Sequence, residues 1–386
     1  MLLVDDSLFF LITDKIVCTQ TYAFSGKIAI RLKFMQMIKV GFIGLNPDSQ
    51  WASRSHVPAL KSLSGDFVIT GVANSTYESA KRTADVLQIP HAFENAQALI
   101  ASPEVDLVVI TVRVPYHFEL VKAALEAGKH VYCEHPLGNG LAETRALAEI
   151  AAAKNVVAVT GTQMVVAPEI VYLQKLIAEG YAGRVLSTTL IGSGGGWRNE
   201  AAENASYLFD KTNGATMLTI PLAHTLAGVQ KVLGGIDTLT ACMTSNFHEV
   251  KIKETGEVKV KTAEDQIMVI GTLKSGAAIT IHYRGGTSRG TNLLWEINGT
   301  EGDIQITAPL GHGQLAPLTI KGARGEEKEL KPLSLPEGNP AVENVKRMYE
   351  LIAGDIKNST GNAPGFQDAV SLYEILEAIE RSSKNF

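Results

Sequence analysis

A short loop after an apolar strand is the first place in this sequence where residue types and spacing could do chemistry. The apolar run 38–43 has strand length, and a helix-compatible segment begins soon after it. The loop between them contributes four residues to a candidate phosphate-binding turn: Gly44, Leu45, Asn46 and Ser49. The G-x-G-x-x-G fingerprint would need glycine at 44, 46 and 49, but Asn46 tolerates a left-handed backbone and Ser49 can bind a phosphate. The loop predicts either a dinucleotide site or an ordinary strand-to-helix turn.

A second strand, 67–73, ends in Asn74 and Ser75. In a dinucleotide fold this strand end lies under the adenosine ribose, where Asp or Glu binds both hydroxyls of NAD. No acid is present here, and the basic residues Lys81 and Arg82 follow on the next helix, a combination that tolerates a 2′-phosphate. These residues favour NADP over NAD. The alternative is that Asn74 and Ser75 only cap the helix that follows them.

Further polar residues stand where later apolar runs end. Arg113 and His117 follow one such run, Glu134 ends the next, and Gln163 follows the last run of the first half. The carboxyl ends of parallel strands meet at one edge of a sheet, and ligands bind there. We therefore expect these residues near the cofactor, with the Glu134 peptide facing a nicotinamide. The alternatives are that Arg113 is a solvated loop arginine and that His117 caps or packs beside the nucleotide site.

The elements that must position these residues fall into two groups. Alternating strands and helices over 38–162 predict a Rossmann-type parallel sheet that is covered on both faces. Over 163–386, extended segments with period-two alternation are joined by hairpin-type turns at 274–276 and 299–302, which predicts an α+β domain with an open, mainly antiparallel sheet. A helix over 342–356 is expected to cross back to the first domain. The predicted fold class is α/β followed by α+β.

Composition excludes several function classes. The 386 residues are 45% hydrophobic and 19% charged, which is typical of a globular protein. A net charge of -5 without any Lys/Arg block argues against a nucleic-acid surface. Three scattered cysteines predict neither a disulfide framework nor a zinc site, and a reducing, cytoplasmic location is expected. His56 and His312 are among the histidines that show no ligand spacing, so no metal is assigned.

The first 37 residues are expected to lie outside the fold. The apolar stretch 8–12 follows Asp5 and Asp6, where a signal peptide would carry positive charge, and it is too short to span a bilayer. Met35 and Met37 stand immediately before the first convincing strand, as an upstream mis-assigned start would place them. The alternative is a genuine docking arm.

The sum of these motifs resembles the Gfo/Idh/MocA family of oxidoreductases over nearly all of 38–386. The resemblance is carried by GFIGLN at 41–46, VVIT before His117, ALEAGKHVYCEHP at 124–136, LIAEGYAGRVLS at 176–187, and His224. Within the family the sequence is most similar to the branch that contains the fungal galactose-pathway repressor. That similarity lies in GLN followed by Trp51, the entry to His117 without T-P-N, Gln163, and the Gly194–Trp197 run.

The resemblance implies a nicotinamide cofactor, NADP or NAD, and hydride transfer to or from a carbon that bears a sugar-like hydroxyl. Two positions depart from the family: its E-K-P lysine is His135, and its aspartate four residues before the catalytic histidine is Ile220. His224 and His135 are expected to be catalytic, because histidine removes a hydroxyl proton near neutral pH. The alternatives are that His224 is a buried helix histidine bound to a carbonyl, and that His135 only shapes the loop.

Aromatic and basic residues complete the expected pocket. Trp197 and Arg198 follow three glycines on a loop that is predicted to be mobile and to cover the substrate, because an aromatic face packs well on a sugar ring. The alternative is a flexible surface loop. Tyr283, at a strand end, is also predicted to line the pocket. The branch resemblance places Trp51 towards the nicotinamide, whereas base rates favour the core.

Three functions fit these features. The first is an NADP-preferring oxidoreductase acting on a sugar, polyol or lactone; the second is a non-catalytic NADP-binding regulator of another protein; the third is cofactor-assisted glycoside cleavage. Family members dimerise through the open sheet, and a candidate face contains Ile279, Ile281, Leu294 and Ile297. Those residues could equally pack on the domain's own helices. No direct contact with nucleic acid or membrane is expected.

Overall fold

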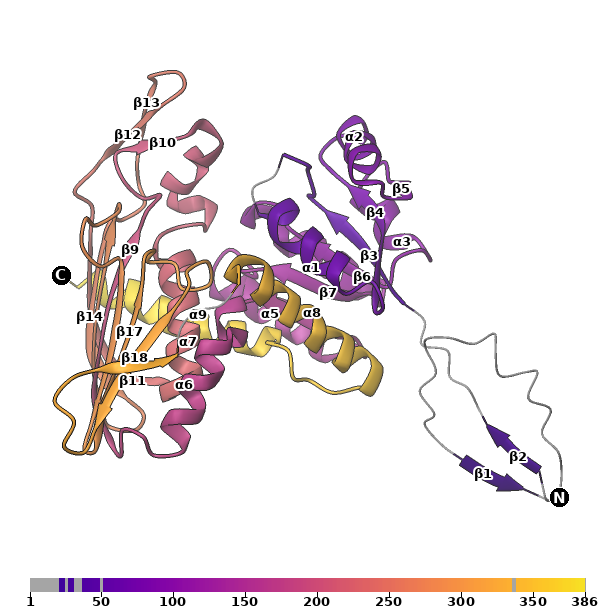
Figure 1. Cartoon of the computed structure of the whole chain (residues 1–386). Helices are drawn as coiled ribbons and strands as arrows, with labels where there is room; N and C mark the ends of the chain where they lie inside the picture. The colour runs from indigo at the N-terminus through magenta and orange to yellow at the C-terminus, as the bar shows by residue number, and fades with distance from the viewer. Residues whose placement is uncertain (1–20, 25–26, 31–36, 49–50, 335–337, 386) are drawn as a thin grey trace.

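The structure is a computed structural model that describes all of the chain except 1–20, 25–26, 31–36, 49–50, 335–337 and 386. Two large sheets with their helices lie side by side (Figure 1). A short hairpin, β1 (Thr21–Phe24) and β2 (Lys27–Ile30), forms a two-stranded sheet of its own away from both. In the described part of the chain, no helix has the length and apolar character to cross a membrane.

The first sheet is parallel and has six strands. In spatial order they are β5 (His91–Ala92), β4 (Phe67–Ala73), β3 (Ile38–Ile43), β6 (Leu107–Ile110), β7 (His130–Glu134) and β8 (Ala158–Gly161). The connecting helices are α1 (Val57–Ser62), α2 (Tyr77–Leu87), α3 (Ala96–Ala101), α4 (His117–Glu126) and α5 (Leu141–Ala152). The central strands are apolar on both faces, as expected when helices cover both sides. The predicted Rossmann-type sheet is confirmed.

The second sheet has eight strands and is open. In spatial order they are β11 (Ile236–Thr244), β14 (Gln266–Leu273), β15 (Ala278–Gly285), β9 (Val185–Gly194), β16 (Leu293–Gly299), β17 (Gly302–Ala308), β18 (Thr319–Arg324) and β19 (Lys331–Ser334). All neighbours are antiparallel except β15 and β9. A small sheet of β10 (Glu200–Ala201), β12 (Glu249–Ile252) and β13 (Val258–Val260) extends beyond one end. The predicted mainly antiparallel sheet is confirmed, whereas the small sheet was not foreseen.

Helices cover one face of the second sheet. They are α6 (Pro168–Ala178), α7 (Ala223–Leu233) and α9 (Phe366–Ser383). Ile279, Ile281 and Ile297 are buried on this covered face, as the alternative of packing on the domain's own helices predicts, whereas Leu294 pairs with Ile191 on the opposite face. Period-two alternation assigns residues to two faces but does not say which face the helices cover.

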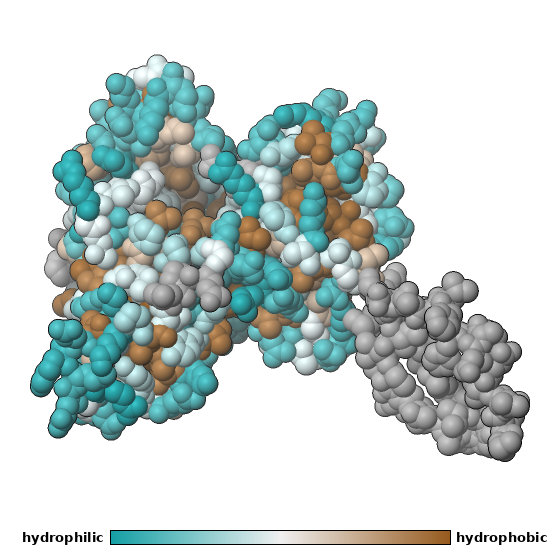
Figure 2. All heavy atoms as spheres, viewed as in Figure 1, coloured by the Kyte–Doolittle hydropathy of each residue, from teal (hydrophilic) through white to brown (hydrophobic). Residues whose placement is uncertain are grey.

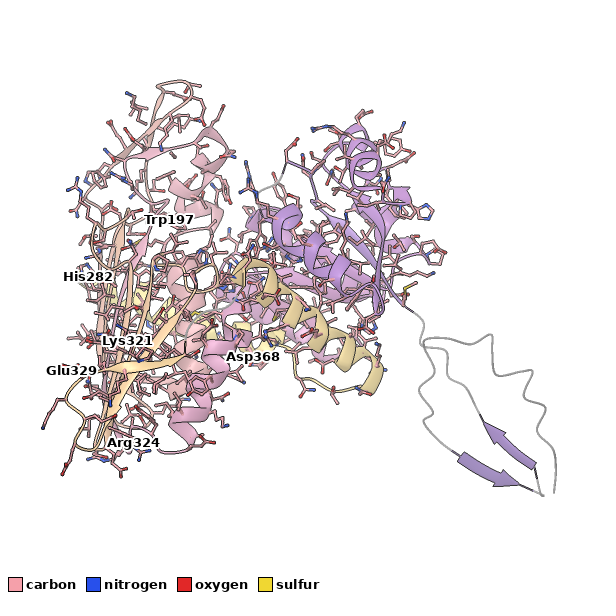
Figure 3. The ribbon with its side chains drawn as sticks, in the orientation of Figure 1. Trp197, His282, Lys321, Arg324, Glu329 and Asp368 are labelled. Atoms are coloured by element: carbon pink, nitrogen blue, oxygen red, sulfur yellow. The ribbon has the colours of Figure 1, made fainter. Side chains whose placement is uncertain are left out.

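The opposite face of this sheet carries exposed apolar side chains. Ile270 is 61% exposed and Met268 37%. His282 pairs with Met268 across β14 and β15 and lies on the same side, at the far edge of the molecule from the first domain (Figure 3).

The C-terminal helices join the two sheets. Helix α8 (Pro340–Asn358) packs on α1 of the first domain, and α9 lies between α5 and β11. Ser382 and Ser383, at the end of α9, accept hydrogen bonds from the backbone of β11 at 2.9 and 2.8 Å. Figure 2 shows a V-shaped cleft between the two domains on the side opposite these contacts.

Candidate functional site

The loop after β3 turns tightly against the end of β6. Gly44 has a φ of 99°, which favours glycine, and a Cβ atom there would lie 2.6 Å from Val112 Cγ1. Leu45 is buried. Asn46 is not left-handed, so the reason for expecting it in place of glycine is wrong. Its Oδ1 instead accepts a hydrogen bond from the Asp48 N–H at 2.9 Å and closes the turn. Ser49 lies outside the described residues.

Asn74, at the end of β4, is bound to helix α2. Its Nδ2 donates to Ser79 Oγ and Thr83 Oγ1, both at 3.2 Å, whereas its Oδ1 is buried without a partner in the described structure. The helix cap is Thr76, which accepts the Ser79 N–H, so the alternative that Asn74 and Ser75 cap the helix is wrong. The free Oδ1 is an acceptor that suits a ribose hydroxyl.

The two cations of α2 lie at the surface. Arg82 Nη2 donates to Asp48 Oδ2 at 2.7 Å, and both side chains are exposed. Lys81 Nζ lies 5.0 Å from the centroid of the Tyr77 ring. A 2′-phosphate would therefore compete with Asp48 for Arg82.

A buried carboxylate at the end of β7 collects three N–H donors. Glu134 is 9% exposed, and its Oε2 accepts from Trp51 Nε1 at 2.7 Å. Its Oε1 lies 3.0 Å from His56 Nε2 and 2.7 Å from Gln163 Nε2. A Cβ atom on Gly161 would lie 2.8 Å from Oε1, so this position must remain small. Hydrogen bonds to an ionised carboxylate are among the stronger ones, so Glu134 anchors three segments of the chain.

Two tyrosines extend this Glu134 network. His56 Nδ1 lies 2.8 Å from Tyr349 Oη on α8, and Gln163 Nε2 donates to Tyr132 Oη at 3.0 Å. Burial and the nearby Glu134 charge raise the pKa of both phenols well above their ordinary value. The tyrosines stay protonated, and α8 is thereby joined to the strand ends. Residue types alone did not reveal His56, because its partners are distant in the sequence.

His117 and Arg113 take separate places after β6. His117 is buried, with Nδ1 2.7 Å from the Pro136 carbonyl and Nε2 3.0 Å from the Val112 carbonyl. Burial lowers the pKa of His117, although the two carbonyls oppose the shift. Arg113 is exposed, and its guanidinium carbon lies 4.6 Å from the ring centroid of Tyr207 in the second domain. His117 thus packs beneath the strand ends, and Arg113 reaches across to the facing domain.

His135 presents a free acceptor atom. The His135–Pro136 peptide bond is cis, and the imidazole is buried. Nε2 donates to the Thr219 carbonyl at 2.9 Å, which places the proton on Nε2 and leaves the lone pair on Nδ1. Nδ1 is buried and has no partner in the described structure. Burial lowers the pKa of His135 to about 4, so the ring is neutral at pH 7.

Three histidine rings form a cluster at this point. The ring centroid of His224, on α7, lies 5.1 Å from that of His135 and 5.2 Å from that of His312. His224 Nδ1 and His312 Nε2 are buried without partners among the described residues. Burial, reinforced by the neighbouring rings, lowers the pKa of His224 well below its usual value and that of His312 to about 4. The cluster is therefore neutral at pH 7.

The predicted substrate residues are differently placed. Trp197 is 6% exposed and lies in a turn whose backbone N–H at Trp197 donates to the Gly194 carbonyl at 3.0 Å, while the mobility expected of this loop stays a prediction. It lies at the end of the large sheet towards β10 (Figure 3), and its Nε1 is buried without a partner in the described structure. Arg198 is exposed beside Gly286. Tyr283 is fully buried and supports the cluster from behind instead of lining an open pocket.

The unpartnered groups mark the strand ends as the site. Asn74 Oδ1, Gln163 Oε1, and the nitrogens of His135 and His224 are buried polar atoms that a ligand could satisfy. A groove of about 750 Å³ lies between α6, α7, α8 and α9. None of the residues that line this groove carries a buried polar atom without a hydrogen-bond partner in the described structure. Within the described ranges, no group of three or more His, Cys, Asp or Glu side chains is arranged to hold a metal ion.

Two family profiles match consecutive parts of this chain. Residues 38–162 match the oxidoreductase family with the NAD-binding Rossmann fold, GFO_IDH_MocA. Residues 168–308 match the C-terminal domain of Gal80p. The first domain thus matches the Gfo/Idh/MocA family, and the second matches the C-terminal domain of Gal80p.

Individual relatives agree with both profiles. The galactose/lactose metabolism regulatory protein GAL80 of Kluyveromyces lactis is 26% identical, over 90% of this chain and 94% of its own. The dehydrogenase aclE of Aspergillus oryzae is 28% identical, over 90% and 96%. The crystal structure of a super-repressor mutant of Gal80p from Saccharomyces cerevisiae superposes with a TM-score of 0.85 at 26% identity, covering 91% of this chain and 96% of that one. The chain thus resembles both a regulator and a dehydrogenase.

The residues at the strand ends fit the dinucleotide that this Gfo/Idh/MocA domain implies. Gly44 gives the tight turn after β3, and Asn74 offers a free acceptor at the ribose end. Gln163 offers a second free acceptor at the end of β8, next to Glu134. These residues would hold the cofactor beside the histidine cluster. His135 Nδ1, in this cluster, is buried and has no hydrogen-bond partner among the described residues.

The histidine cluster predicts a stability that falls in mild acid. Unfolded histidines bind protons below about pH 6.5, whereas the folded rings of His135 and His312 do so only near 4. Between those values the unfolded state holds more protons, so the free energy of unfolding drops as pH falls, by up to about 1 kcal/mol per pH unit for each ring. Urea unfolding from pH 7 to pH 5 measures this slope.

The matched variants are His224→Gln and His248→Gln. His248 is exposed, so its replacement should leave the slope unchanged, whereas His224→Gln should flatten it. A slope that is the same in all three proteins would show that the cluster does not control acid stability.

Proposed function

We propose that the protein is an NAD(P)-dependent oxidoreductase acting on a hydroxyl-bearing carbon of a sugar, polyol or related compound. The observation that carries this proposal is the free Nδ1 lone pair of His135, 5.1 Å between ring centroids from His224, at the end of a strand in an NAD-binding Rossmann fold. Oxidation of an alcohol removes a hydride from carbon and a proton from oxygen. A bound nicotinamide supplies the hydride acceptor.

The protein supplies the proton acceptor. His135 holds its own proton on Nε2 through the Thr219 carbonyl, so a substrate hydroxyl can donate to Nδ1. The His224 ring, 5.1 Å away from the His135 ring between centroids, can orient the same oxygen or take the proton itself. The lowered pKa values keep both rings in the accepting, neutral form at pH 7, although each is a weaker base than an exposed histidine. The missing lysine and aspartate therefore do not remove proton transfer from the site.

A non-catalytic, nucleotide-binding regulator is the second candidate. It is favoured by the loss of the family's lysine and aspartate at His135 and Ile220, and by the 26% identity to GAL80 regulators along most of the chain. In that case the neutral cluster would bind a ligand without turning it over. Measured turnover distinguishes the two candidates, because both require nucleotide binding.

The test of the proposed function is turnover of a sugar and polyol panel with NAD⁺ and NADP⁺. We expect formation of reduced cofactor by the wild type and a loss of about 10² to 10⁴ in turnover for His224→Gln, because a positioned acid–base group contributes that much. Cofactor affinity, measured by calorimetry, should stay within about twofold by the same reasoning, since proton transfer and nucleotide binding use different groups.

The control is again His248→Gln, which should match the wild type. Full turnover by His224→Gln would remove this residue from the mechanism. Tight nucleotide binding with no turnover of any compound would reject the enzyme and favour the regulator.

We propose further that the cofactor is NADP in preference to NAD. The support is the absence of an acid at position 74 and the presence of Lys81 and Arg82 on α2. Asn74→Asp should shift the ratio of the two cofactor dissociation constants towards NAD by about tenfold, because a carboxylate repels a 2′-phosphate and accepts a ribose hydroxyl. Asn74→Ala removes the amide without adding charge and is the control. An unchanged ratio in Asn74→Asp would reject this role for position 74.

We also propose that the protein self-associates through the outer face of its second sheet. Ile270 and Met268 expose apolar surface there, and contiguous exposed apolar surface often marks an interface. Light scattering should give about twice the chain mass of 41.4 kDa for the wild type, and the monomer mass for Ile270→Lys. Val86→Lys, at a residue on α2 that is 58% exposed, should remain a dimer. A monomeric wild type would contradict the proposal.

A further inference from the structure

His312 stands on a turn that is fixed from both sides. A Cβ atom on Gly311 would lie 2.1 Å from the Ser193 carbonyl oxygen, and one on Gly313 would lie 2.4 Å from Met164 Sδ. Backbone contact restricts position 311 to glycine, whereas a side chain at position 313 would have to displace the end of Met164. The packing places the His312 ring 5.2 Å from the ring of His224, centroid to centroid.

Tyr283 braces this turn against helix α7. Its hydroxyl lies 2.7 Å from Thr225 Oγ1, next to His224, and 3.0 Å from the Gly311 carbonyl, next to His312. Burial raises the pKa of Tyr283, so the hydroxyl keeps its proton and the contacts persist across the working pH range. A fully buried tyrosine thus connects the segments that carry His224 and His312.

A small pocket of about 210 Å³ opens beside the cluster. Its lining residues are Ser193, Gly195, Gly196, Trp197, Pro221, Thr287, Asn292, Leu310, Gly311 and His312. None of these described residues carries a formal charge at neutral pH, given that the lowered pKa of His312 keeps its ring neutral. The lining side chains themselves offer an anionic ligand no cationic partner in return for its lost hydration; outside the lining, Arg284 Nε donates to Ser193 Oγ at 3.4 Å.

Besides His135 Nδ1, three hydrogen-bonding atoms around the pocket and cluster are buried and unsatisfied by the described residues. They are Trp197 Nε1, a donor, and His224 Nδ1 and His312 Nε2, each a donor or an acceptor according to tautomer. Leaving such atoms unpaired is costly, and hydroxyl groups can both donate to and accept from them. A metal ion does not fit, because these side chains are not arranged to hold one in the described structure.

We propose that His312 is a further substrate-binding residue, which together with Trp197 selects a neutral polyhydroxylated ligand over its phosphorylated or carboxylated counterpart. This inference rests on the proposed function, since the ligand's reacting hydroxyl would lie at His135 and His224 while its distal hydroxyls bind His312 and Trp197. The pocket is smaller than the roughly 300–1,000 Å³ of drug-sized sites, which suits one compact ring.

The test is calorimetry of the protein saturated with NADPH, so that an added alcohol binds without reacting. The probes are D-galactose, D-xylose and myo-inositol, with D-galactose 6-phosphate as the charged counterpart. We expect at least one neutral probe to bind the wild type, and the phosphate ester to bind at least about tenfold more weakly. His312→Phe should weaken the neutral probe by about tenfold to a hundredfold, because two hydrogen-bonding nitrogens are lost at similar volume.

Two further variants keep the result interpretable. His312→Gln retains a donor and an acceptor and should lose less affinity than His312→Phe, and Trp197→Phe removes only the N–H and should weaken binding as well. The control His248→Phe should bind as the wild type does, and thermal unfolding shows that each variant is folded.

Unchanged affinity in folded His312→Phe, equal binding of the phosphate ester, or no binding of any neutral probe to the wild type would each overturn the inference. Measurements of turnover distinguish a failure of this inference from a failure of the proposed function. Neutral-probe binding that depends on His312, without turnover by the wild type, supports the inference while rejecting the enzyme. Turnover with wild-type KM in His312→Phe rejects the inference alone.

Discussion

A buried carboxylate that must be satisfied is the constraint on which the rest of this site depends. Glu134 sits at the end of a central strand, where an uncompensated charge would be costly. Its donors, Trp51, His56 and Gln163, come from the first helical segment and from the turn after the last strand of the sheet. Through His56, the network also reaches Tyr349 on α8. One carboxylate therefore connects the first helical segment of the Rossmann domain, the turn after its last strand and a C-terminal helix.

The residue that follows Glu134 differs from it, because one of its side-chain nitrogens has no hydrogen-bond partner in the described structure. His135 follows Glu134 directly, and the two side chains bind different parts of the molecule. Glu134 is saturated by donors within the first domain, whereas His135 contacts Thr219 and the rings of the second domain and keeps one nitrogen free. A binding site needs both kinds of group. The satisfied hydrogen bonds of Glu134 give rigidity, and the unpartnered nitrogens of the histidine cluster are free to recognise a ligand.

The chain resembles both a regulator and a dehydrogenase, and the two activities place different demands on the Glu134 network and on the histidine cluster. Both activities need the nucleotide-binding strand ends, which depend on the backbone around Gly44 and on the Glu134 anchor. Only catalysis needs an acceptor for the proton of the reacting hydroxyl, and in the proposed function that requirement falls on His135 and His224. Fold likeness alone does not separate the two activities, since they differ in a few side chains at one site and share the scaffold.

Periodicity and turn residues in the sequence determined the two sheets, their strand directions and the edge at which Asn74, Glu134 and Gln163 meet, because parallel βα units bring strand ends together. Tertiary structure decided the rest. Alternation gives two faces but does not say which one is covered, so only the tertiary structure placed Ile279 on the covered face. His312 joined the site because a distant, glycine-flanked turn packs against α7, a contact between segments far apart in the chain that no local pattern encodes.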